Sequence, residues 1–99
     1  MFHVHVYGPQ RKSVWFFNLT HLELLEVEEG VAGPHPVGQI GLIAKECELN
    51  LIHLAEIAED NEVSILVHPV MEDEIAAHST HAQWYGKEIE LNLDFFLPG

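Results

Sequence analysis

The chain has 99 residues, of which 47% are hydrophobic, and its 16 acidic and four basic side chains give a formal charge of −12. This length supports one domain, residues 1–99, with one modest core, and it excludes a catalytic domain joined to a separate substrate domain. The negative charge repels phosphate backbones and anionic lipid surfaces, so neither nucleic acid nor a membrane is expected as a partner.

The sequence also argues against export and membrane insertion. No apolar run approaches the roughly 18 residues of a membrane span, and the first residues lack the pattern of a secretory signal. We therefore expect a cytoplasmic protein. The single cysteine, Cys47, has no partner for an internal disulfide.

The N-terminal half predicts three strands. Apolar and polar residues alternate from Phe2 to Tyr7, as in a strand with one buried face. A short helix is predicted for 10–18, a second strand for 20–27 and a third strand for 37–44. The glycines and prolines of 28–36 break regular structure, so a loop is predicted there.

The C-terminal half predicts two helices and a fourth strand. Apolar residues follow helical spacing from Leu49 to Ala58, and the β-branched run 63–67 reads as a strand that His68-Pro69 closes. The segment from Glu72 to Trp84, with acidic residues in its first turn, predicts a final helix. The alternating tail 89–97 predicts an edge strand.

This order of elements predicts an α+β ferredoxin-like sandwich, βαββαβ, with a shortened first helix and a C-terminal helix and tail. In such a sandwich, helices cover one face of an antiparallel sheet and the other face stays open. A second copy of the chain is the natural partner for an open sheet face, so we expect a homodimer.

Eight histidines are the outstanding feature of the composition, because neutral imidazole is the commonest ligand of transition metals. His3 and His5 share the polar face of the first strand, and the sheet order brings His35 and His68 toward that strand. His78 and His81 are three residues apart and would share one side of the predicted final helix. His21 and His53 fall outside this set, and we interpret them as structural or surface residues.

Each histidine taken singly also fits an exposed or purely structural role. The spacing matches no zinc signature, since neither His-Glu-x-x-His nor paired Cys-x-x-Cys is present. A nucleophilic serine elbow, a phosphate-binding glycine loop and a dinucleotide fingerprint are also absent from the sequence, which argues against hydrolases and dehydrogenases.

The chain resembles the DOPA 4,5-dioxygenase-like family along nearly its whole length. The resemblance rests on His3-Val4-His5-Val6-Tyr7, on Gly33-Pro34-His35-Pro36, on Val67-His68-Pro69, and on Asp73, His78, His81, Ala82, Trp84 and Gly86 before the leucine-rich tail 91–97. Two features depart from the family pattern. The stretch between Tyr7 and Gly33 is short, and Ala77 stands where an acidic residue often precedes the first histidine of the pair.

The resemblance implies a dimeric ferredoxin-like protein that opens a catechol-type ring with O2 beside a non-haem Fe(II). On that hypothesis we assign the metal to His5, His68 and His81, proton transfer to His35 and His78, and substrate contact to His3, Tyr7 and Trp84. Asp73 is the one good candidate for a carboxylate ligand.

Two other readings stay open at this point. The short first helix favours a catalytically silent, dimeric module that binds a metal or small ligand. A plain structural or interaction domain would require the histidines to scatter. The sequence does not choose among DOPA, other catechols and other enolisable rings.

Overall fold

The computed structural model describes residues 1–8 and 22–97 and contains a five-stranded antiparallel sheet in the order β2-β3-β1-β4-β5. The strands are β1 (Phe2–Tyr7), β2 (Glu23–Glu28), β3 (Gln39–Ala44), β4 (Ser64–Pro69) and β5 (Gln83–Tyr85). The helices are α2 (Leu51–Asn61) and α3 (Glu74–Ala77), with 3-10 turns η1 (Glu46–Glu48) and η2 (Leu93–Phe96). This topology confirms the ferredoxin-like prediction, while the helix predicted at 10–18 lies outside the described residues.

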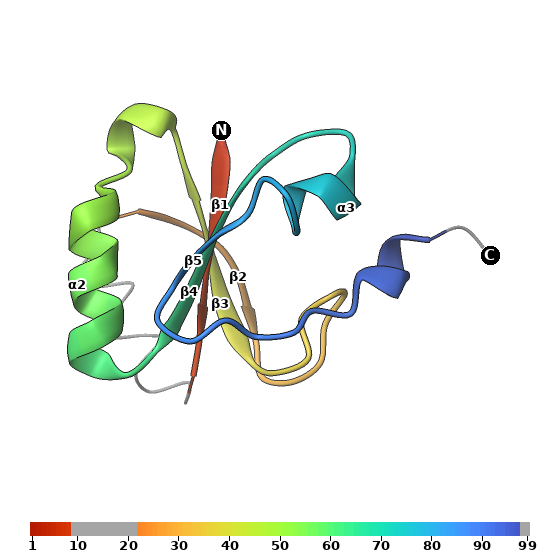
Figure 1. Cartoon of the computed structure of the whole chain (residues 1–99), viewed down its shortest axis with the longest axis horizontal. Coiled ribbons are helices and arrows are strands. Elements are labelled where there is room, and N and C mark those ends of the chain that lie inside the picture. The colour runs from red at the N-terminus through yellow and green to blue at the C-terminus, as the bar shows by residue number, and fades with distance from the viewer. Residues whose placement is uncertain (9–21, 98–99) are drawn as a thin grey trace.

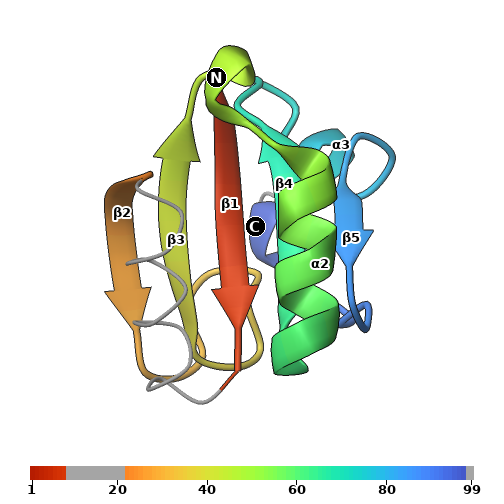
Figure 2. The ribbon, with the colours of Figure 1, turned by 90° about the vertical axis from the view of Figure 1, so that its left-hand side faces the viewer.

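Helix α2 covers one face of the sheet (Figure 2). It begins where the Asn50 side chain accepts a hydrogen bond from the His53 backbone N–H, and it ends at Glu62, whose φ of 54° is left-handed. It lies against β4 and β5, and its buried residues belong to the same core as Val4 and Val6 of β1, which are fully buried. The helix predicted from Leu49 to Ala58 is therefore confirmed, although it begins two residues later and ends three residues later. Among the described residues, no helix has the length and apolar character needed to cross a membrane.

The alternation along β1 places His3, His5 and Tyr7 on the other face. In the register of the sheet, His3 is opposite His68 of β4, and His5 is opposite Gly41 of β3. Because β1 is the central strand, its histidines have neighbours on both sides. The predicted convergence of β1 and β4 on this face, which we call the histidine face, is present.

A β-bulge in β2 turns an acidic side chain toward the histidine face. Leu24 pairs with Leu42 and Glu26 pairs with Gly41, so Leu25 is the extra residue. The insertion lets Leu25 and Glu26 both line the histidine face. Gly41 makes room for Glu26, since a Cβ at that position would lie 2.8 Å from the Glu26 Cγ.

The helix predicted for 72–84 is wrong in length. Asp73 caps α3 as the acidic start suggested, accepting a hydrogen bond from the Ala76 N–H, but the helix ends at Ala77. The Ser79 hydroxyl donates to the Ile75 carbonyl, and the His81 N–H donates to the Ala76 carbonyl, which closes the turn. Residues Gln83–Tyr85 then pair with β4 as strand β5, although the sequence pattern predicts a helix that extends to Trp84.

The edge strand predicted in the tail is also wrong. β5 holds that edge of the sheet, and the tail instead folds into η2 after the Asn92 N–H donates to the Pro34 carbonyl. Figure 1 shows α3 and η2 on the opposite side of the sheet from α2. The histidine face is therefore partly covered by the chain's own C-terminal segments and is not the open face that the sequence suggested.

Candidate functional site

Five histidines meet on the histidine face. His5, His35, His68 and His78 are buried, while His3 is half-buried at the margin. The ring centroids of His68 and His78 are 4.0 Å apart, and those of His5 and His35 are 4.3 Å apart. A hollow of about 330 Å³, within the size range of small-molecule sites, opens over them. It is lined by these five histidines together with Leu25, Glu26, Pro34, Glu74 and Phe96.

Three sequence segments supply the remaining imidazoles. His68 is the second-last residue of β4, His35 lies in the loop before β3, and His78 follows the last residue of α3. The Ala32–His35 bridge holds the loop with two backbone hydrogen bonds. Phe96 of η2 packs against His78 with ring centroids 4.9 Å apart, so the tail forms part of the wall of the hollow.

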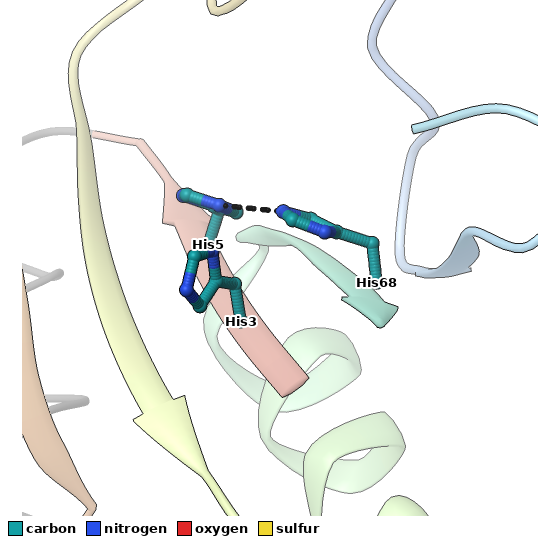
Figure 3. A group of neighbouring side chains, drawn as sticks. All are labelled: His3, His5 and His68. Carbon is teal, nitrogen blue, oxygen red and sulfur yellow. Dashed lines mark hydrogen bonds between the residues drawn. The ribbon is translucent and has the colours of Figure 1, made fainter. Parts of the chain in front are cut away.

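The hydrogen bonds of His5 and His68 fix where their protons lie. His5 Nδ1 donates to the side-chain oxygen of Gln39 at 2.7 Å, and His68 Nδ1 donates to the Pro69 carbonyl at 3.0 Å. A neutral imidazole has only one N–H, so both Nε2 atoms carry lone pairs. These two Nε2 atoms face each other at 3.0 Å (Figure 3).

Burial keeps these rings neutral. Desolvation, together with the smaller effect of the neighbouring imidazoles, lowers the pKa of His5 and of His68 to about 3. Desolvation likewise lowers the pKa of His35 to about 4. A proton shared between His5 and His68 is thus disfavoured at neutral pH, and the two opposed lone pairs are available to a cation.

A divalent metal fits this arrangement. Two nitrogens bound to one first-row metal at about 2.1 Å lie about 3.0–3.4 Å apart, as the two Nε2 atoms do. In the described part of the chain, two sets of three histidines can each bring ligand atoms within 4.8 Å of one another: His3 with His5 and His68, and His5 with His35 and His78. His5 belongs to both sets.

His81, the third predicted ligand, belongs to neither set. It is exposed and lines a different hollow with Phe2, Leu51 and Val67, on the α2 side of the sheet. The predicted three-residue spacing on one helix face fails because α3 ends before His78. Asp73 is likewise committed to capping α3, whereas Glu26 and Glu74 are the carboxylates that line the hollow over the histidines.

The other predicted residues lie at or beside the cluster. The Tyr7 hydroxyl is 2.5 Å from His35 Nδ1, and burial raises the pKa of that hydroxyl, so it stays protonated. Tyr7 also stacks on Trp84 at 5.6 Å, and Trp84 lines a neighbouring hollow beside His78. His78 Nδ1 donates to the Glu74 carbonyl at 2.8 Å, so in the neutral ring the lone pair lies on Nε2.

Sequence reasoning missed Gln39 and Glu26. Gln39 is buried at the start of β3 and bonds His5, while the Glu26 Oε1 lies 3.9 Å from His5 Nδ1. A glycine inside a predicted strand, Gly41, is the one sequence signal of a close approach at this point. Glu26 itself gives no signal, because the bulge that turns it is invisible in the pattern.

The fold and the histidine cluster together define a small ferredoxin-like protein with a candidate metal centre. The model of the Dopa 4,5-dioxygenase family matches residues 2–95, so the chain belongs to this family. A solved structure of a candidate dioxygenase from Nostoc punctiforme is similar, with a TM-score of 0.79 and 25% sequence identity. The similarity covers 95% of this chain and 88% of the Nostoc chain. Among curated proteins, none matches.

Proposed function

We propose that the protein is a non-haem iron dioxygenase that opens a catechol-type ring with O2 at the histidine face. The observation that carries the proposal is the opposed pair of lone pairs on His5 and His68, beside a hollow large enough for a small aromatic ring. Membership of the Dopa 4,5-dioxygenase family supports the reaction class. His3, His5 and His68 would hold the metal, which when bound would activate O2 and make the catechol more acidic.

His78 is the proposed base. Its unprotonated Nε2 lines the hollow, so it can accept a proton from a catechol hydroxyl. The imidazolium formed would be stabilised by the Glu74 carboxylate, 3.8 Å from His78 Nδ1. His35 is the proposed partner in proton return, since the Tyr7 hydroxyl donates to its Nδ1 and so places the proton of the neutral ring on Nε2.

Ring opening is tested by reconstituting the protein with Fe(II) without oxygen, then following O2 uptake and absorbance with DOPA, caffeate and simple catechols. We expect iron-dependent uptake and a yellow product. His78→Gln is expected to lower the rate about 100- to 10,000-fold while Fe(II) still binds, because only the proton acceptor is removed. His53→Gln, at an exposed position on α2, is the matched control and should retain full activity.

One observation favours a second function, a catalytically silent metal- or ligand-binding module. Both sets of candidate ligands in the described residues consist of histidines alone, whereas oxygen-activating iron sites usually combine two histidines with a carboxylate. Binding of iron without O2 uptake on any catechol tested would support this module and contradict the dioxygenase.

We also propose that the chain forms a homodimer, with the cytoplasm as its compartment. Exposed apolar side chains on β2 and the following loop, including Leu24, Val27 and Val31, support a contact surface outside the histidine face. Light scattering is expected to give twice the chain mass of 11.2 kDa. A mass of one chain at micromolar concentration would contradict the dimer.

A further inference from the structure

The proposed function assigns no role to the buried side chain of Gln39. It is a polar group that is only 2% exposed, at the first position of β3 opposite Tyr7. Its amide nitrogen finds no hydrogen-bond partner among the described residues. Burying an unpaired donor costs free energy, so we expect the side-chain oxygen of Gln39 to make an interaction that offsets this cost.

The side-chain oxygen of Gln39 accepts a hydrogen bond from His5. The Gln39 oxygen is 2.7 Å from His5 Nδ1, and an amide oxygen can only accept, so the proton of His5 is held on Nδ1. The ring therefore presents the lone pair of Nε2 to the cluster. The proton of His68 is likewise held on Nδ1, by the Pro69 carbonyl. That acceptor belongs to the backbone, so it does not depend on the side chain of residue 69.

Glu26 does not replace Gln39 in this role. Its oxygen is 3.9 Å from His5 Nδ1, which is beyond hydrogen-bond distance and leaves Gln39 as the one bonded acceptor among the described residues. Gly41 keeps this side of the ring open, because a Cβ there would lie 3.3 Å from His5 Nδ1. Substitutions at Gln39 and at Glu26 can therefore test the effect of each acceptor on His5 separately.

We propose that Gln39 is a positioning residue that fixes the tautomer of His5, so that Nε2 of His5 is available to a metal. The inference rests on the metal site of the proposed function but not on turnover. Because His5 belongs to both candidate ligand sets, Gln39 acts whichever set the metal uses. Groups that orient a metal-binding histidine typically change metal affinity about 10- to 100-fold when they are lost.

The tautomer of His5 is measured in metal-free protein at pH 7 by long-range ¹⁵N–¹H correlation, with His5→Ala to assign its signals. We expect the proton on Nδ1 in the wild type and in Glu26→Gln, and a mixture of tautomers in Gln39→Met, which keeps the length of the side chain but has no oxygen. Gln39→Glu restores an acceptor and should restore the Nδ1 tautomer. A wild-type proton on Nε2, or a shift in Glu26→Gln instead of Gln39→Met, would overturn the proposal.

Metal affinity gives the second readout, through titration with Co²⁺ followed by its visible absorption. Gln39→Met is expected to weaken Co²⁺ binding about 10- to 100-fold, and Gln39→Glu to bind within a few-fold of the wild type or tighter. Unchanged affinity in folded Gln39→Met would contradict the proposal. If the wild type binds no Co²⁺, the metal site of the proposed function fails, and the tautomer measurement alone decides on Gln39.

Discussion

Replacing His5 by alanine is expected to reduce Co²⁺ affinity at least about 100-fold. His5 is the one histidine shared by both candidate ligand sets, so no remaining set of three among the described residues is complete without it. Sites with four ligands bind structural zinc with about 10–16 kcal/mol, which is on the order of 3 kcal/mol for each ligand, or about 100-fold in the dissociation constant.

The same titration distinguishes the two ligand sets. His3→Ala should weaken binding strongly and His35→Ala only slightly if the metal lies between His5 and His68, and the reverse result would place it with His35 and His78. His81→Ala and His53→Ala are expected to change the dissociation constant little, because both side chains are exposed away from the cluster. A large loss in His81→Ala would show that the ligand assignment from the sequence was correct.

Lowering the pH from 7 to 5 is expected to destabilise the metal-free protein. Burial lowers the pKa of His5 and His68 to about 3 and that of His35 to about 4, against 6.5 in the unfolded chain. Below pH 6.5 the unfolded chain therefore binds protons that the folded chain excludes. The stabilisation is complete above about pH 6.5 and is lost as the pH falls toward 4 and 3, at up to about 1.4 kcal/mol per pH unit for each ring.

Urea unfolding at pH 7, 6 and 5 measures this dependence. By pH 5 each of the three rings accounts for about 2 kcal/mol of the loss. His35→Gln should reduce the pH dependence, whereas His53→Gln should leave it unchanged. A free energy of unfolding that does not vary over this range would mean that the buried imidazoles are not held neutral.

Local patterns predicted much of this fold. The alternation of Phe2, Val4 and Val6 with His3 and His5 gave the central strand and the correct face for both histidines. The strands at β2, β3 and β4 and the helix α2 were also predicted to within a few residues, because β-branched runs, helical spacing and the breaking glycines and prolines are all local signals. Because the sheet order follows from the ferredoxin-like topology, the approach of His35 and His68 to β1 could be predicted too.

The failures have a common physical cause, which is that distant partners overrule local preference. Trp84 and its neighbours pair with β4, so the helix that starts at Asp73 stops at Ala77. The tail alternates like a strand, but its N–H at Asn92 bonds to Pro34 instead of to a sheet edge. Neither partner is visible in the local sequence. Because the helix ends at Ala77, the prediction that His81 shares a helix face with His78 also failed.

The central place of β1 affects how the chain must fold. β1 precedes both of its partner strands in the chain, and the contact between His5 and His68 joins residues 63 positions apart. A sheet built on such distant pairings has high contact order, which slows folding. A nascent chain that has not yet reached β4 therefore exposes the apolar face of β1, and a metal cannot meet His3, His5 and His68 together until β4 has left the ribosome.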